Sequence, residues 1–146
     1  MTVVIAETRD VALCRALRRV VFIEEQGVSE ADELDDKDDV AVHLLARDAG
    51  HALGSARLLV TGDTGTIGRV CVLPEGRGRG IGAALIRAGV AHFRQRGDLA
   101  KVKLGAQTHA LGFYATMGFH PVGEDYDDAG IPHRDMILIL APRQAG

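Results

Sequence analysis

The stretch Val70-Cys-Val-Leu-Pro-Glu-Gly-Arg-Gly-Arg-Gly-Ile-Gly-Ala-Ala-Leu-Ile86 decides the fold expected of this chain. Its apolar start is typical of a strand, Pro74 ends that strand, and helical periodicity follows the last glycine. Glycines let backbone N–H groups turn toward an anion, and the first N–H groups of a helix lack partners within the helix. Arg77 and Arg79 add charge-assisted hydrogen-bond donors. The segment 77–82 therefore predicts a diphosphate site.

The residues around this segment exclude two common nucleotide loops. A P-loop ends in Gly-Lys-Ser/Thr, whereas Gly82 is followed by two alanines. A dinucleotide fingerprint follows the first strand of a βαβ unit and has an acidic residue about 20 residues later. Here the glycines follow an antiparallel group of strands, and the next strand carries Lys101 and Lys103. Taken alone, however, a Gly-Arg repeat is equally typical of a flexible surface turn.

Periodicity and turn residues predict the other elements. Strands are expected at 3–7, 40–47, 52–61, 66–73, 99–106, 119–123 and 136–140, and helices at 10–25, 80–96 and 109–117. The segment 29–39 holds seven carboxylates and one lysine and is expected to be a solvated loop. A second loop is expected at 125–132, and Gly54 is expected to mark a β-bulge.

Composition places the chain among globular proteins. Its 146 residues suit one domain spanning 1–146, with 47% apolar and 25% charged residues. The net charge of −3, with only four Phe and two Tyr, argues against a nucleic-acid partner. No signal peptide or bilayer-length apolar run is present, so we expect no membrane partner and a cytoplasmic location. Cys14 and Cys71 are expected to be reduced core residues, and no spacing fits a metal site.

Two motifs resemble those of the GNAT acetyltransferase superfamily. Arg77-x-x-Gly80-x-Gly82 matches its Q/R-x-x-G-x-G/A motif, and Ala110-Leu-Gly-Phe-Tyr-Ala-Thr-Met-Gly-Phe119 matches its A-x-x-F-Y-x-x-x-G-F segment. The segments 19–26, 33–36, 38–44 and 130–136 are similar to the ElaA/YjcF-type branch, which brings no defined substrate.

The resemblance implies an α+β, α/β/α-layered GNAT fold. Its central sheet would be mixed and mostly antiparallel, with six to seven strands flanked by about four helices. It also implies an N-acetyltransferase that moves an acetyl group directly from acetyl-CoA, its co-substrate, to a primary amine of a small molecule or peptide.

The same resemblance assigns roles to individual residues. Backbone groups of Val70 and Val72 would pair with the pantetheine arm, and the Val72 N–H would polarise the thioester carbonyl. Tyr114 would donate a proton to the departing thiolate. Phe113 is expected either in the core or along the cofactor. The pyrophosphate would bind Arg77, Gly78, Arg79, Gly80, Ile81 and Gly82.

The general base, the acceptor and the oligomeric state stay open. The strand before the loop carries Arg69 and Cys71 on one face, where some relatives have a glutamate. The remaining base candidates are Glu25, Glu33, His43, His133 and a water chain. A homodimer is an alternative to a monomer. A non-catalytic acyl-CoA-binding sensor or partner-binding module is the alternative to an enzyme.

Overall fold

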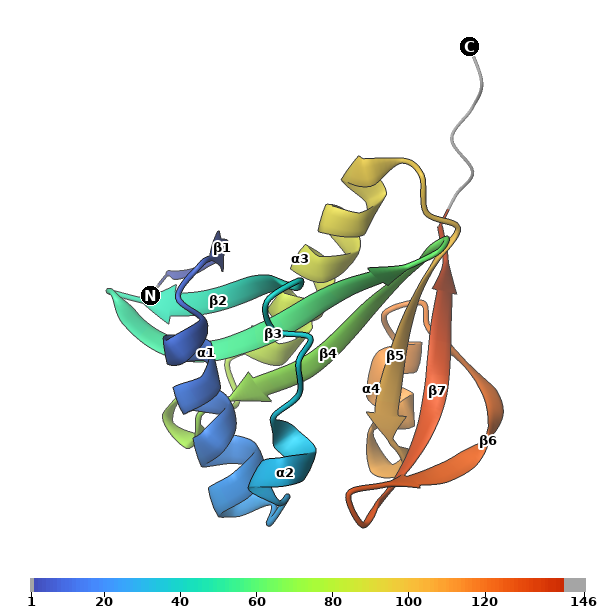
Figure 1. The fold of residues 1–146 in the computed structure, drawn as a ribbon. Helices are drawn as coiled ribbons and strands as arrows, with labels where there is room; N and C mark the ends of the chain where they lie inside the picture. The colour runs from blue at the N-terminus through green and yellow to red at the C-terminus, as the bar shows by residue number, and fades with distance from the viewer. Residues whose placement is uncertain (1, 141–146) are drawn as a thin grey trace. The chain divides into compact units, whose positions relative to one another are not determined.

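The computed structural model describes residues 2–140. Its elements are, in chain order, β1 (Val3–Thr8), α1 (Val11–Arg18), η1 (Arg19–Glu25), α2 (Glu30–Glu33), β2 (Val42–Asp48), β3 (His51–Thr61), β4 (Thr64–Val72), η2 (Pro74–Gly76), α3 (Ile81–Arg96), β5 (Lys101–Gln107), η3 (Thr108–Ala110), α4 (Leu111–Ala115), β6 (His120–Asp128) and β7 (Ile131–Ile139) (Figure 1). The strand order is β1-β2-β3-β4-β5-β7-β6. Strands β4 and β5 pair in parallel, whereas β1–β2, β2–β3, β5–β7 and β6–β7 are antiparallel. The α+β class with a mixed, mostly antiparallel sheet is confirmed.

The described chain packs as two compact units. The first contains the described residues up to Leu59 together with Ile67–Ala91, and the second contains Val60–Thr66 and the described residues from His92 onward. Strands β3 and β4 and helix α3 each contribute residues to both units. A single domain over residues 1–146 stays a prediction.

The first helix of the first unit changes its winding midway. Asp10 caps α1, its side chain accepting a hydrogen bond from the Leu13 N–H at 3.1 Å. Beyond Arg18 the helix continues as η1, a π-helix, in which Gln26 N–H reaches back five residues to the Val21 carbonyl at 3.2 Å. Gly27, with φ of +73°, ends it. The helix expected at 10–25 is confirmed, with a wider second half.

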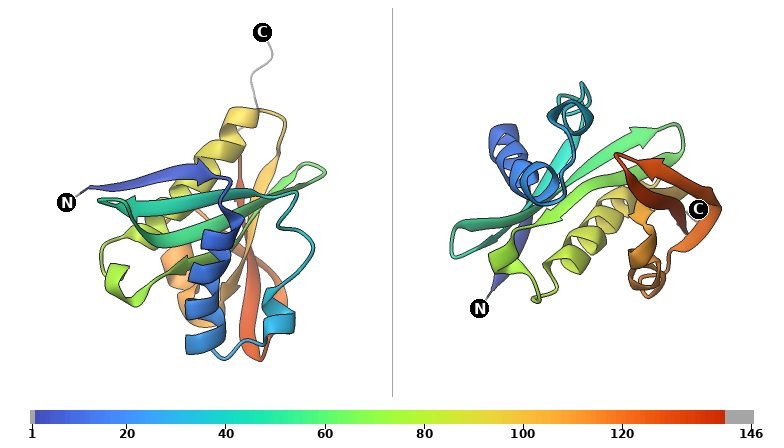
Figure 2. Two further views of the ribbon diagram at one scale, coloured as in Figure 1. Left: turned by 60° about the vertical axis from the view of Figure 1, so that its left-hand side comes forward. Right: turned by 90° about the horizontal axis from the view of Figure 1, so that it is seen from below.

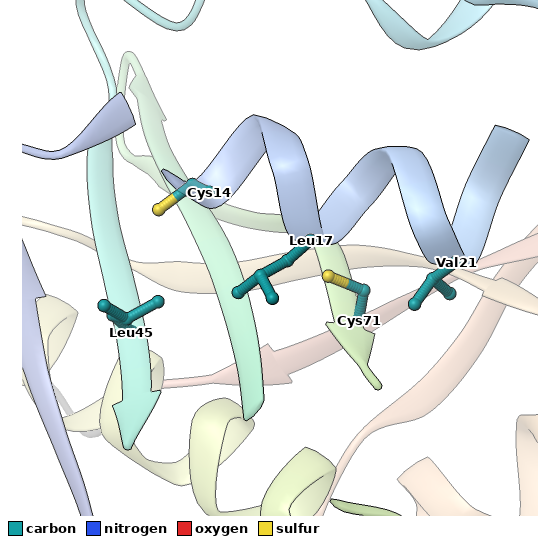
Figure 3. Packing of buried hydrophobic residues seen from close by; sticks show 5 residues of the cluster. All are labelled: Cys14, Leu17, Val21, Leu45 and Cys71. Carbon is teal, nitrogen blue, oxygen red and sulfur yellow. The ribbon is translucent and has the colours of Figure 1, made fainter. Parts of the chain in front are cut away.

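Helices cover both faces of strands β2–β4 in the first unit (Figure 2). On one face, the buried side chains of α1 and η1 meet those of β2 and β4 (Figure 3); these residues are Cys14, Leu17, Val21, Leu45 and Cys71. On the other face α3 lies against the strands so closely that a Cβ on Gly89 would come within 2.9 Å of Ile67. Apolar burial on both faces therefore holds β4 firmly ahead of the loop.

The second unit is built on β5, β6 and β7. Val102 and Leu104 of β5 are buried with Met136 and Leu138 of β7, as the sequence alternation predicts. The short helix α4 ends before Gly118, whose left-handed φ of +96° stops the helix.

Three sequence expectations are wrong. The segment 29–39 is no simple solvated loop, because it contains α2 and buries Glu33 and Asp38. The loop expected at 125–132 is mostly strand, because the polar strand β6 runs to Asp128 and lacks the apolar alternation that sequence reasoning needs. Of the two expectations for Phe113, its 45% exposure rules out a core position, and contact with the cofactor stays a prediction. The bulge expected near Gly54 is confirmed by a shift in the β2–β3 register opposite it.

None of the helices within residues 2–140 has the length and apolar character needed to cross a membrane.

Candidate functional site

The end of β4 forms a firm base for the glycine-rich loop. Val70 and Val72 lie in this strand, and the next residue, Leu73, donates its N–H to the Leu53 carbonyl at 2.8 Å. Pro74 then opens the tight turn η2. At the end of that turn Gly76 is buried, and a Cβ there would lie 3.2–3.3 Å from neighbouring side chains.

The loop itself is open. Gly78 and Gly80 have φ of +79° and +74°, a left-handed conformation that side chains rarely adopt. A Cβ on either would meet nothing within 4 Å, so the backbone conformation requires these glycines and crowding does not. The first hydrogen bond of α3 runs from the Ala84 N–H to the Gly80 carbonyl at 3.0 Å. The N–H groups of residues 81–83 precede it and have no acceptor inside the helix, which favours an anion there.

Both arginines of the loop are paired with carboxylates. Arg77 donates two hydrogen bonds to Glu25, at 2.6 and 2.9 Å, and a third to the Val72 carbonyl at 3.2 Å. Hydrogen bonding from Arg77 lowers the pKa of Glu25. Arg79 is paired with Asp48 in β2. Before any diphosphate binds, each of the two arginines is therefore already paired with a carboxylate.

A network of buried charges fixes the segment 29–39, which we call the acidic segment. Arg18 donates to both oxygens of Asp38, at 2.9 and 3.0 Å, and also to Glu33. Arg57 of β3 donates to both oxygens of Asp35, at 2.7 and 3.0 Å. Burial raises the pKa of Asp38, but hydrogen bonds from arginines outweigh it and hold that pKa well below its ordinary value.

Arg69 joins this network from a strained position. Its φ is +51°, which is uncommon for a side-chain-bearing residue in a strand. Its guanidinium donates to the backbone carbonyls of Asp32 and Glu33, at 3.3 and 3.1 Å. Desolvation by burial lowers the pKa of Arg69, although the group still pairs with the acidic segment. Arg69 therefore ties β4 to that segment and is no base.

Three of the four side chains considered as the base are committed elsewhere. Glu25 holds Arg77, and Glu33, only 3% exposed, holds Arg18. His43 is buried, with Nε2 hydrogen-bonded to the Asp38 carbonyl at 3.0 Å. His133 differs, because its ring is half-buried and one ring nitrogen is left without a hydrogen bond from any residue in 2–140.

The second unit carries the aromatic pair of the downstream motif. Tyr114 lies on α4 with its ring edge-on to Phe113 at 5.0 Å and to Phe119 at 6.3 Å between centroids. Desolvation by burial raises the pKa of Tyr114, so it stays a phenol at neutral pH. Its hydroxyl forms no hydrogen bond with the described residues and is available as a donor.

The two cysteines are ill-suited to covalent catalysis. Cys14 and Cys71 are both free and buried, as expected. Burial raises the pKa of Cys14 to about 11 and raises that of Cys71 as well. Because the thiolate is the nucleophilic form, neither residue suits an acyl-enzyme.

Sequence reasoning missed the buried charge network, although one signal was available. Arg57 is the one charged residue of the mostly apolar stretch Ala52–Val60, where a buried arginine needs a carboxylate partner. Its partners lie about twenty residues earlier, and only the fold brings them together.

Comparison with known proteins identifies the family of the chain. Residues 21–140 match the model of the acetyltransferase (GNAT) domain. The chain belongs to the GNAT acetyltransferase family. The uncharacterized N-acetyltransferase YjcF of Bacillus subtilis strain 168 is 31% identical over 122 residues, covering 83% of this chain and 86% of YjcF.

Solved structures of this family share the fold. The crystal structure of Escherichia coli ElaA has a TM-score of 0.82 and 27% identity, covering 94% of this chain and 99% of ElaA. A GNAT family acetyltransferase from Elizabethkingia anophelis with acetyl-CoA bound has a TM-score of 0.73 at 16% identity, covering 94% of this chain and 98% of that protein. At that identity the likeness concerns the fold alone.

Proposed function

We propose that this GNAT acetyltransferase is an N-acetyltransferase that transfers the acetyl group of acetyl-CoA directly to a primary amine of a small molecule or peptide. The observation that carries the proposal is the loop at 77–82. Two left-handed glycines, open space above them and a helix N-terminus with unpaired N–H groups together fit a diphosphate. Acetyl-CoA contains such a diphosphate, and it supplies the activated acetyl thioester.

The residues of β4 and the loop would hold the donor. Backbone groups of Val70 and Val72 would pair with the pantetheine arm, with the Val72 N–H donating to the thioester oxygen, where negative charge develops during attack. The N–H groups of residues 78–82 would bind the pyrophosphate, and Arg77 and Arg79 would exchange their carboxylate partners for it.

Direct transfer needs a proton donor for the leaving thiolate. Tyr114 suits this role, because it is protonated at neutral pH and its hydroxyl has no hydrogen bond to any residue between 2 and 140. The exposed ring of Phe113 would contact the cofactor. The raised pKa values of both cysteines favour direct attack by the amine over a covalent acyl-enzyme.

An assay of free CoA release over a library of primary amines tests the proposal. We expect turnover with at least one amine, dependent on acetyl-CoA. Tight acetyl-CoA binding without turnover of any amine would contradict it and would favour a non-catalytic acyl-CoA sensor.

Replacing Tyr114 by Phe tests the proton donor. The phenyl ring keeps the edge-on contacts with Phe113 and Phe119 and loses only the hydroxyl. We expect kcat to fall by roughly 10²–10⁴-fold, with a smaller change in KM. An unchanged kcat would assign Tyr114 a packing role only.

A further inference from the structure

A single guanidinium joins the Glu25 carboxylate to the backbone of Val72. Arg77 donates through its two terminal nitrogens to Glu25, at 2.9 and 2.6 Å, and through Nε to the Val72 carbonyl at 3.2 Å. All three residues belong to the first unit. The carboxylate of Glu25 is therefore held beside the end of β4.

The N–H of Val72 points to the same side of β4 as its carbonyl. The next residue, Leu73, donates its N–H to Leu53 of β3, and the backbone groups of successive strand residues point to opposite sides. Both backbone groups of Val72 thus point away from β3. Glu25 is held, through Arg77, on the side to which the Val72 N–H points, and this N–H is the group proposed to bind the thioester oxygen.

The packing of η1 fixes the place of Glu25. Val21 of η1 is buried in the same cluster as Cys71, the neighbour of Val72 in β4 (Figure 3). Glu25 follows Val21 by four residues, close to one turn of the helix, so its side chain leaves the helix on the same side. Glu25 therefore extends the packed face of η1 to the end of β4.

Of the base candidates that are already hydrogen-bonded, Glu25 is the one with an exposed partner. The side chains of Glu25 and Arg77 are 35% and 46% exposed. By contrast, Glu33 and His43 are only 3% and 4% exposed. An exposed ion pair contributes little free energy, so another anion can replace Glu25 on Arg77 at small cost. Hydrogen bonding from Arg77 lowers the pKa of Glu25, and release would raise that pKa and make the carboxylate a stronger proton acceptor.

The acetyl donor competes with both contacts of Arg77. Its pyrophosphate would take the guanidinium from Glu25, and its pantetheine arm would take the backbone carbonyl of Val72. The carboxylate of Glu25 would thus be released when the thioester arrives.

We propose that Glu25, released from Arg77 when acetyl-CoA binds, accepts the proton that the attacking amine loses. This inference rests on the proposed function. As the bond between the amine nitrogen and the acetyl carbon forms, the nitrogen gives one proton to a Glu25 oxygen, directly or through one water. The carbon–sulfur bond breaks with its electron pair on sulfur, the thiolate takes a separate proton, and Glu25 returns its proton to solvent. Arg77 occupies the base until the donor is in place.

The release is tested first with CoA alone, without any amine. Carbon-13 NMR of the side-chain carboxyl, assigned by the signal missing from Glu25→Gln, measures the pKa of Glu25. We expect saturating CoA to raise that pKa, and Arg77→Met to raise it in the free protein. The other ionisable groups facing Arg77 are Glu75 of η2 and the buried thiol of Cys71, and Glu75→Gln should keep the rise. An unchanged pKa of Glu25 in saturating CoA would overturn the proposal.

The second test uses an amine that the wild-type protein acetylates. Glu25→Gln keeps the size of the side chain and an oxygen that can accept from Arg77, and it loses the proton acceptor. We expect this variant to lower kcat by roughly 10²–10⁴-fold while binding acetyl-CoA at least as tightly as wild type. Glu25→Asp should recover part of kcat. Glu24→Gln, which changes the adjacent exposed carboxylate, should keep wild-type kcat.

The possible failures are distinguishable. Wild-type kcat in Glu25→Gln would overturn the role of Glu25 and leave the acetyltransferase intact. A loss of kcat with an equal loss of acetyl-CoA affinity would also overturn it, because Glu25 would then serve only to hold Arg77. Absence of wild-type turnover with every amine would remove the proposed function and, with it, this role.

Discussion

Two arginine–carboxylate pairs of the first unit have the same bidentate geometry and opposite surroundings. Arg18 and Asp38 are each about 1% exposed, whereas Arg77 and Glu25 are 46% and 35% exposed. A buried pair cannot lose one member without leaving an uncompensated charge, so it behaves as a fixed support. An exposed pair is weak, because water replaces either partner at little cost. Burial therefore separates an arginine that holds the fold from one that is free to exchange its anion.

The largest effect is expected from Asp38→Asn. Removing one charge of the buried pair should lower the free energy of unfolding by about 3–5 kcal/mol, measured by urea unfolding. The exposed neighbour provides the control, since Asp39→Asn should change stability by less than about 0.5 kcal/mol. Equal effects of the two variants would show that the Arg18–Asp38 pair does not support the fold.

The next effect is on cofactor binding. Arg77→Glu places repulsive charge beside the loop, so we expect acetyl-CoA affinity to fall by roughly 100-fold or more by calorimetry, with stability almost unchanged. Arg96→Glu, which replaces another exposed and ion-paired arginine of the chain, should keep wild-type affinity. Wild-type affinity in Arg77→Glu would remove the loop assignment.

A smaller effect is expected in acid. Arginine hydrogen bonds lower the pKa of both Asp38 and Asp35 in the folded state, outweighing the effect of burial. Their stabilisation is full above the carboxyl pKa of the unfolded chain, about 3.9, and is lost as pH falls through the lower folded-state values. Unfolding free energies measured from pH 5 down to pH 2 should fall more steeply for wild type than for Asp38→Asn. Parallel curves would contradict the assignment.

The smallest effect is expected from Glu25→Gln. Removing the resident anion frees Arg77 for the pyrophosphate, so acetyl-CoA should bind more tightly, by no more than about fivefold because the pair is exposed. Titration calorimetry at low salt measures the change. Weaker binding would mean that Glu25 orients Arg77 for the cofactor instead of competing with it.

Local patterns predicted much of the fold. Periodicity, caps and turn residues predict the helix at 10–25 and the strand, loop and helix between 66 and 96, and the structure agrees. The strand predicted at 119–123 is shorter than the observed β6, because the exposed polar residues of β6 carry no alternation of apolar and polar side chains. Its backbone is fixed by pairing with β7, which a local pattern does not reveal.

Part of the candidate site can likewise be predicted from local patterns, and part cannot. The loop can be predicted because its glycines and arginines are adjacent in sequence. The acidic segment was misjudged because its arginine partners, Arg57 and Arg69, lie twenty or more residues away. Likewise, only the fold shows that Nδ1 is the nitrogen of His133 that is hydrogen-bonded within residues 2–140. A site formed by one contiguous segment can be predicted from the sequence, whereas a site assembled from distant segments cannot.

The π-helical winding of η1 has a consequence for sequence change. An α-helix advances about 100° per residue, so the wider turn stores close to one extra residue between Arg18 and Gln26. Deleting one residue there would restore ordinary α-helical winding without turning the residues that follow, so Glu25 would keep its side of the helix and its pair with Arg77. The winding of this helix can therefore absorb a one-residue change of chain length, and the anion that faces the loop is insulated from it.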